Sequence, residues 1–318
     1  MSVKMSDNLP KSELCNFSIE GAVGHITMAR SEVFNAMNNK LISELISLLN
    51  WSSERSAGPL GTQVDESGSE FLRVITLAGE GKHFCAGADI NMMRDAGAKS
   101  DEDNRQDSRR LDKLFNSLWA HPCFTITTVQ GVALGGGAGL IACSDHVIGQ
   151  PSTRIALSEG KLGILPAVIG PYVYRRVGSA QFRRLAMLAG QFDAAEALNI
   201  GMIDQVAASP DEAVTMAEEA ISTVLTTGPS AVYKAKKLTL KFDRFGNFLF
   251  ATTPLSSTGY IFPPAPNIEG PWYAQNSYYD YDESEQYDWN TVNNKDVNFV
   301  EPTYIDSDTK NNVWVSYS

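Results

Sequence analysis

The sequence predicts an α/β protein, because segments with the pattern of strands alternate with segments that have the pattern of helices. Two glycine-bearing turns fit this alternation: CAGAD at 85–89 and LGGGAG at 134–139 each follow a strand-like run and precede a helix-like one. The chain has 318 residues, of which 43% are hydrophobic, as is usual for a globular protein with an ordinary core.

The first part of the chain supplies most of the expected strands. Strands are expected at 14–20, 21–29, 71–79 and 122–131, and helices at 40–51, 90–97 and 111–120. Leu41, Leu45 and Leu48 would lie on one face of the first helix, and Asp89 is placed to cap the second. Two polar segments between these elements, 52–70 and 98–110, are expected to be a flexible surface insertion and a mobile charged segment.

The part after the glycine cluster is expected to be mainly helical. Short extended pieces are expected at 146–149 and 154–159, and helices at 166–178, 179–190, 193–201 and 211–228.

The composition changes near residue 241, which predicts three parts: an N-terminal extension at 1–13, a main domain at 14–241 and an acidic, Tyr- and Asn-rich tail at 242–318. The tail holds 11 of the 37 acids but only 3 of the 26 bases, so nucleic-acid binding by it is disfavoured. It shows no sustained periodicity, and we expect it to be disordered or loosely packed; its dense tyrosines could instead form an interaction surface. No apolar run is long enough for a membrane helix and no signal peptide is recognisable, which predicts a cytoplasmic protein without a membrane partner.

Several familiar motifs fail on spacing. A dinucleotide-binding GxGxxG that starts at Gly135 would have Leu140 at its third glycine, and a phosphate-binding P-loop ending at GEGKH has Thr76 and His83 at required positions. No GxSxG motif is present. The four cysteines and four histidines lack metal-ligand spacing, so we expect no metal site and buried, reduced thiols.

The two glycine-bearing turns are the features that suggest chemistry. Main-chain N–H groups at the start of a helix have no intrahelical partner, and two of them from separate loops could stabilise negative charge on a carbonyl oxygen. Glycine at such turns lets a ligand approach the main chain closely. Either turn alone is unspecific, whereas the pair suggests an oxyanion hole.

Four motifs in order resemble one family: GKHFCAGADI, VQGVALGGGAGLIACSD, RIALSEGKLGILPAVIGPYV and AGQFDAAEALNIGMID. Together with RSEVFNAMN, they resemble the enoyl-CoA hydratase/isomerase (crotonase) family over about residues 14–240. The run SEGKLGILPAVIGPYVYRRVG is most similar to hydratases of branched or carboxylated substrates, of the methylglutaconyl-CoA or isohexenylglutaconyl-CoA type. The resemblance implies the family's spiral of ββα units and assembly as a homotrimer or a dimer of trimers.

The resemblance also implies roles for individual residues. The N–H groups of Ala88 and Gly136 would form the oxyanion hole, and Glu159 matches the family's second catalytic glutamate. Gly139 stands where the first catalytic glutamate usually lies, so Glu159 would have to handle both proton transfers. Positions that match coenzyme A contacts, where coenzyme A belongs to the substrate and no separate cofactor is implied, are Phe34, Ala36, Lys82, Ala86, Asp89 and Ile90.

The function that follows from the resemblance is syn addition of water to an enoyl-CoA, in fatty acid metabolism or leucine catabolism. An isomerase or decarboxylase that uses the same oxyanion hole is the alternative within the fold. A crotonase-fold protein that only binds a partner is the alternative from another class, because the tail does not resemble the family's C-terminal helices.

Overall fold

The structure is a computed structural model that describes residues 4–5, 8–96, 99–239, 260–262 and 313–315. The chain divides into two compact units, Met1–Lys234 and Ala235–Ser318, and each is described by itself.

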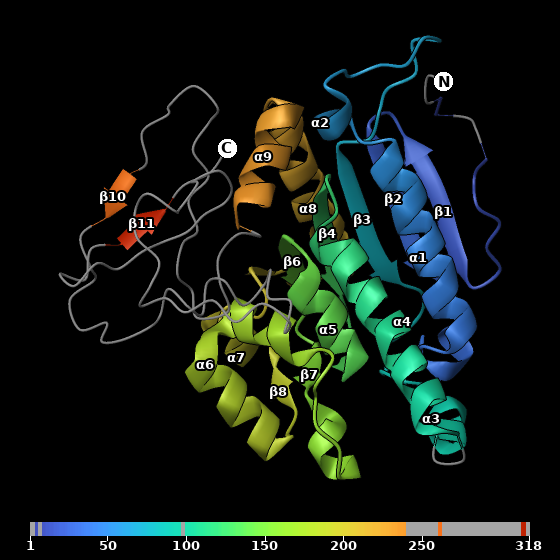
Figure 1. The fold of residues 1–318 in the computed structure, drawn as a ribbon, viewed down its shortest axis with the longest axis vertical. Coiled ribbons are helices and arrows are strands. Elements are labelled where there is room, and N and C mark those ends of the chain that lie inside the picture. Colours follow the sequence, from blue (N-terminus) through green and yellow to red (C-terminus); the bar gives the residue numbers. More distant parts are fainter. Residues whose placement is uncertain (1–3, 6–7, 97–98, 240–259, 263–312, 316–318) are drawn as a thin grey trace, which may run out of the picture. The chain divides into compact units, whose positions relative to one another are not determined.

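A sheet of six strands forms the centre of the first unit (Figure 1). The strands, in their order across the sheet, are β1 (Cys15–Glu20), β2 (Val23–Met28), β3 (Val74–Gly79), β4 (Phe124–Val129), β6 (His146–Gly149) and β9 (Gln205–Val206). The first pair is antiparallel and all later pairs are parallel. A second sheet consists of β5 (Val132–Leu134), β7 (Arg154–Ala156) and β8 (Phe192–Asp193).

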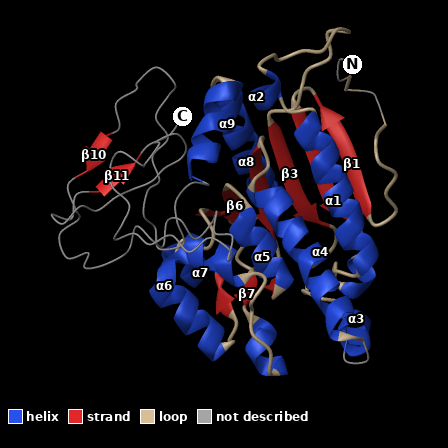
Figure 2. Ribbon diagram, viewed as in Figure 1, coloured by secondary structure: helices blue, strands red, loops and turns tan. Residues whose placement is uncertain are grey.

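Helices surround these sheets (Figure 2). They are α1 (Asn39–Glu54), α2 (Ala57–Leu60), α3 (Ile90–Ala96), α4 (Asp101–Trp119), α5 (Gly136–Cys143), α6 (Gly170–Leu188), α7 (Ala194–Asn199) and α8 (Pro210–Leu225). A further helix, α9 (Pro229–Thr239), begins in the first unit and ends in the second. Two 3₁₀ turns lie in the connections, Ser31–Val33 between β2 and α1 and Ser158–Leu162 between β7 and α6. Among the described residues, no helix has the length and apolar character needed to cross a bilayer.

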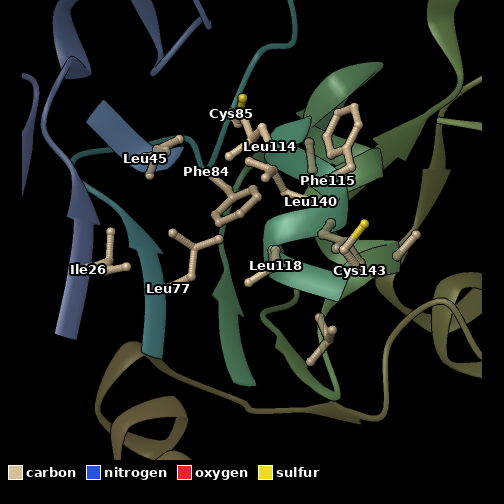
Figure 3. Packing of buried hydrophobic residues seen from close by; sticks show 14 of the residues in the cluster. Ile26, Leu45, Leu77, Phe84, Cys85, Leu114, Phe115, Leu118, Leu140 and Cys143 are labelled. Atoms are coloured by element: carbon tan, nitrogen blue, oxygen red, sulfur yellow. The ribbon is translucent and has the colours of Figure 1, made fainter. Parts of the chain in front are cut away.

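The two faces of the large sheet bury different apolar clusters. Ile75 and Leu77 of β3 face the main core, which also contains side chains of α1, α4 and α5 (Figure 3). Val74, the first residue of β3, faces the opposite side, where Ala213 and Ala217 of α8 cover the sheet. This alternation is the period of two that a strand imposes on its side chains.

The α/β fold class is confirmed, and most elements lie where the sequence predicts them. The two helices expected at 166–178 and 179–190 form the single kinked helix α6. The kink occurs at Gly178, whose φ of 75° and ψ of 169° are not helical, so the expected break is present. The expected helix at 211–228 is shorter, and helix α9 was not predicted.

The prediction of a mobile charged segment at 98–110 is wrong for the residues that the structure describes. Residues 101–110 form the first half of α4. The Ser100 side chain caps the helix by accepting the N–H of Asp103, and Arg105–Glu102 and Arg110–Asp107 are ion pairs three residues apart. Opposite charges at that spacing support a helix, so the charged composition did not indicate a loop.

The prediction of a flexible insertion at 52–70 is wrong at its start. Residues 52–54 continue α1, and Ala57 and Gly58 are buried in α2. Downstream, the Asp65 carboxylate accepts the N–H groups of Ser67 and Ser69 and so closes a tight turn. Most side chains from residue 59 to residue 70 are exposed, as expected of a surface segment.

In the second unit, besides the end of α9, the structure describes a short antiparallel pair, β10 (Tyr260–Phe262) with β11 (Val313–Val315), which the sequence did not predict. The other residues at 242–318, for which a disordered or loosely packed tail was expected, lie outside the described residues.

Candidate active site

Three loop segments lie side by side through main-chain hydrogen bonds. The N–H of Cys85 donates to the Val132 carbonyl over 3.1 Å, and the N–H of Leu134 donates to the Cys85 carbonyl over 3.0 Å. On the other side, Met37 donates to the Gly87 carbonyl over 2.7 Å and accepts from the N–H of Asp89 over 3.0 Å. The two glycine-bearing turns are therefore brought together, and the segment at Met37 is hydrogen-bonded to the other side of the first turn.

The glycines in these turns are required by geometry. Gly87 has a φ of 93°, and a methyl group there would lie 2.7 Å from the Leu134 carbonyl oxygen and 3.8 Å from the Gly136 nitrogen. Gly135 has a φ of 48° and caps α5, whose first intrahelical bond runs from the N–H of Gly139 to the Gly135 carbonyl. Both positions need the left-handed region that glycine adopts without strain.

Two main-chain donors remain available in this arrangement. Within the part of the chain that the structure describes, neither the N–H of Ala88 nor that of Gly136 has a hydrogen-bond acceptor. Gly136 opens α5, so its N–H belongs to the positive end of that helix. The turns can therefore offer two N–H groups to a developing negative charge.

An ion pair holds the first turn in place. Nη1 of Arg30 donates to Oδ2 of Asp89 and to the Ala36 carbonyl, each over 2.7 Å. Oδ1 of Asp89 accepts the N–H of Asn91 over 2.9 Å, which caps α3 as expected. Hydrogen bonding to Arg30 is the main reason that the pKa of Asp89 lies below its ordinary value.

Glu159 lies beside the second turn. It occupies the 3₁₀ turn Ser158–Leu162 after β7, and a methyl group on Gly135 would lie 3.2 Å from its Oε1. Its other carboxylate oxygen, Oε2, is buried and has no hydrogen-bond partner among the described residues. Burial raises the pKa of this carboxyl above its ordinary value, while its own N–H acts in the opposite direction. A half-buried carboxyl with an unused oxygen is suited to exchange protons with a ligand.

The space beside Gly139 is filled by apolar side chains. A methyl group there would lie 2.7 Å from Cγ2 of Ile169 and 2.8 Å from Cε1 of Phe115. A glutamate at position 139 would therefore require both neighbours to move. Asp145, at the far end of α5, accepts the N–H and hydroxyl of Thr125, which supports a structural role.

Most residues predicted to contact coenzyme A lie around the first turn. The N–H of Ala86 donates to the Phe34 carbonyl over 2.9 Å, and the Ala36 carbonyl is held by Arg30. The Asp89 side chain is engaged by the ion pair and the helix cap, so only its main chain is available to a ligand. Two further predicted residues, Lys82 and Ile90, are exposed on either side of this turn.

Two residues near this turn, His83 and Asn35, were not predicted from the sequence. The exposed ring of Phe34 meets His83 edge to face at 4.7 Å, and Nδ1 of His83 accepts the N–H of Val132 over 3.1 Å. Burial, with a smaller effect of Lys82, holds the pKa of His83 below its ordinary value. Asn35 fixes the loop by donating to the carbonyls of Glu80 and His83. Asn35 could have indicated a tight turn in the sequence, because asparagine tolerates a φ such as its 54° better than most residues do.

The cysteines are buried, as the sequence predicts. Burial raises the pKa of Cys85 to about 12, so its sulfur stays a thiol and donates to the Asn35 carbonyl. Leu140, Ile155 and Leu157 are also buried, in the main core.

The family model for enoyl-CoA hydratase/isomerase matches residues 18–243. The chain belongs to this family. A short-chain-enoyl-CoA hydratase of Clostridium acetobutylicum is 30% identical over 223 residues, which cover 69% of this chain and 77% of the relative. A putative enoyl-CoA hydratase of Thermus thermophilus is 29% identical over 55% of this chain and 69% of its own.

Solved structures agree with the family. An enoyl-CoA hydratase from Shewanella pealeana matches with a TM-score of 0.65 and 33% identity, over 72% of this chain and 80% of its own. A putative enoyl-CoA hydratase/isomerase (crotonase) from Legionella pneumophila matches with a TM-score of 0.64 and 35% identity, over 71% and 82% of the two chains. The crotonase-like fold predicted from the sequence is confirmed.

Proposed function

We propose that the chain adds water across the α,β double bond of an enoyl-CoA thioester, with Glu159 as its single catalytic carboxylate. The observation that carries this proposal is the buried, unpartnered Oε2 of Glu159, next to the turn that presents the Gly136 N–H. Family membership supports an acyl-CoA substrate. In this proposal the N–H groups of Ala88 and Gly136 hold the thioester oxygen.

The proposed step balances with one acid. The Glu159 carboxylate takes a proton from water, and the water oxygen forms a bond to the β-carbon. The double-bond electrons move toward the thioester, whose oxygen becomes an oxyanion between the two N–H donors. Glu159 then returns its proton to the α-carbon, and the enolate collapses to the saturated hydroxyacyl thioester. The raised pKa of Glu159 suits both halves of this exchange, because a group that titrates closer to neutrality can accept and return a proton.

An isomerase is the second candidate, because Gly139 leaves the site with one carboxylate. Moving a double bond needs one base that removes and returns a proton at carbon, with no attack by water. The same oxyanion hole would stabilise the dienolate that forms. The two reactions differ in whether oxygen from water enters the product.

The decisive experiment offers the purified protein crotonyl-CoA, 3-methylglutaconyl-CoA and a 3-enoyl-CoA in ¹⁸O-labelled water. Hydration predicts loss of the enoyl-thioester absorbance and one ¹⁸O in the product, whereas isomerisation predicts a 2-enoyl product without label. Glu159→Gln is expected to lower kcat/KM by about 10²- to 10⁴-fold, the usual contribution of an acid–base group. Glu20→Gln, which changes an exposed glutamate on β1, is the control and should leave turnover unchanged.

Each outcome separates the candidates. No turnover of any of the three thioesters would overturn both reactions and favour a protein that only binds a partner. Turnover that Glu159→Gln leaves unchanged would overturn the assignment of the acid alone.

Several sequence-based expectations are separate from this proposal and stay predictions. A branched or carboxylated, methylglutaconyl-type acyl group, a role in leucine catabolism, assembly as a homotrimer or dimer of trimers, and a cytoplasmic location without membrane or nucleic-acid partners are the sequence-based expectations. Coenzyme A enters as part of the substrate, with no separate cofactor. Thioester selectivity tests the first expectation, and light scattering tests the third.

A further inference from the structure

One face of α5 runs from the proposed oxyanion donor into the core. Gly136 and Gly139 are three residues apart in this helix, so they lie on the same face. Neither carries a side chain, which leaves the surroundings of this face to other elements. Any part of a ligand that continues inward past Gly136 would meet what covers Gly139.

The side chains of Met37, Phe115 and Ile169 cover this face, and Cε of Met37 lies nearest to a methyl group placed on Gly136. The Phe115 ring of α4 lies across both glycines, since its Cζ is 3.8 Å from a methyl group placed on Gly136 and 2.9 Å from one placed on Gly139. Cγ2 of Ile169 lies 2.7 Å from the latter position. Phe115 is 0% exposed and Ile169 is 2% exposed, so the face is closed from solvent.

Tyr172, Trp119 and Asp112 support the Phe115 ring. Its ring meets that of Tyr172 at 5.8 Å with an angle of 55°, and Trp119 meets Tyr172 from another side at 6.2 Å. The Tyr172 hydroxyl donates to Oδ1 of Asp112 over 3.0 Å, which fixes the tyrosine between α4 and α6. This backing restricts rotation of Phe115 away from α5, because protein cores are close-packed.

We propose that Phe115 is a specificity-determining residue that closes the inner end of the acyl pocket and restricts the protein to short, uncharged acyl groups. This inference is an alternative to the carboxylated, methylglutaconyl-type acyl group expected from the sequence. The inference rests on the proposed function, because it places the thioester oxygen at Gly136. A long chain that continued along α5 would have to displace the Phe115 ring. A second carboxylate at this end would lie against carbon atoms of Phe115 and Ile169 without a hydrogen-bond partner, which is costly for a charged group.

The test measures binding and turnover separately. Affinity for butyryl-, hexanoyl- and decanoyl-CoA is measured by calorimetry, and kcat/KM is measured with the matching 2-enoyl thioesters and with 3-methylglutaconyl-CoA. The protein is expected to favour four-carbon over ten-carbon groups and crotonyl-CoA over 3-methylglutaconyl-CoA. Each methylene that gains apolar burial contributes about fourfold in affinity. Hexanoyl-CoA has two methylenes more than butyryl-CoA, so Phe115→Ala should raise the hexanoyl-to-butyryl affinity ratio by about fifteenfold.

Two further variants keep the test interpretable. Phe115→Leu removes less volume and serves if the alanine variant fails to fold. Leu114→Ala removes an equally buried side chain from the same helix that is not among the nearest neighbours of Gly136 or Gly139, and it should leave the chain-length ratio unchanged.

The outcomes distinguish this inference from the proposed function. A ratio that shifts with Phe115 but not with Leu114, in a protein that turns over no enoyl-CoA, would support the pocket and overturn the hydratase. Turnover with a preference for ten-carbon groups or for 3-methylglutaconyl-CoA, or an unchanged ratio in both Phe115 variants, would overturn the inference alone. No binding of any acyl-CoA would overturn both.

Discussion

The substitution Glu159→Gln should make the protein more stable while it removes activity. The wild-type residue buries an oxygen that has no partner among the described residues. An unsatisfied buried polar group costs on the order of 1–3 kcal/mol. The residue is only half-buried and the glutamine amide needs partners too, so we expect a gain near the low end, about 1 kcal/mol in the free energy of unfolding at pH 8.

The gain should depend on pH in a defined direction. Burial raises the pKa of Glu159 in the folded state, so the folded protein binds this proton more tightly than the unfolded chain does. The wild-type protein therefore loses stability as pH rises from the ordinary value of 4.5 through the raised pKa, and the penalty is fully present above it. Glutamine does not titrate, so the difference between the two proteins should be large at pH 8 and small at pH 4.

Urea denaturation at both pH values measures this difference, with equal m-values as the sign that only stability has changed. Glu20→Gln, on the exposed surface of β1, should show no such difference. A stability gain that is the same at pH 4 and pH 8, or a loss at pH 8, would refute the physical account of the Glu159 environment.

Two other substitutions test the packing and the ion pair around the site, and the pH profile of the wild-type protein tests its acid–base chemistry. Gly139→Glu should lower stability by about 1–3 kcal/mol and give no gain in turnover, because its Cβ would fall 2.8 Å from Phe115; a more active variant in the enoyl-CoA assay would contradict this. Asp89→Asn should weaken the ion pair with Arg30 and lower kcat/KM at a temperature where thermal unfolding shows that the variant is still folded. A loss of activity that appears only where the variant unfolds would point to a purely structural role. In wild type, kcat/KM should fall on acidification at a pH above that of an ordinary glutamate, and an inflection at or below 4.5 would be inconsistent with the burial of Glu159.

The sequence predicted the two glycine turns because their signals are local. CAGAD and LGGGAG each lie between a strand and a helix, and the observed ladder between Cys85 and Leu134 joins them as an oxyanion hole would require. Phe115 and Ile169 could not be found in this way. They lie 24 and 30 residues from Gly139 in the chain, Phe115 in α4 and Ile169 just before α6, and only the packing of these segments on α5 brings them to one glycine.

The wrong prediction at 98–110 has a different cause. Charge density was interpreted as a solvated loop, whereas the signs of the charges alternate at helical spacing. Glu102 with Arg105 and Asp107 with Arg110 carry the information that the composition alone discards.

The main-chain hydrogen bonds that join the three loop segments have an evolutionary consequence, because the N–H donors and the carboxylate respond differently to mutation. The donors belong to peptide groups, so no substitution except one by proline deletes them, and only a change in backbone path can move them. The carboxylate belongs to a different piece of chain, the turn Ser158–Leu162, and can be exchanged, shifted or lost one codon at a time. Under the proposed mechanism, a lineage with this backbone arrangement can therefore change its reaction while it keeps the two N–H donors for a thioester enolate.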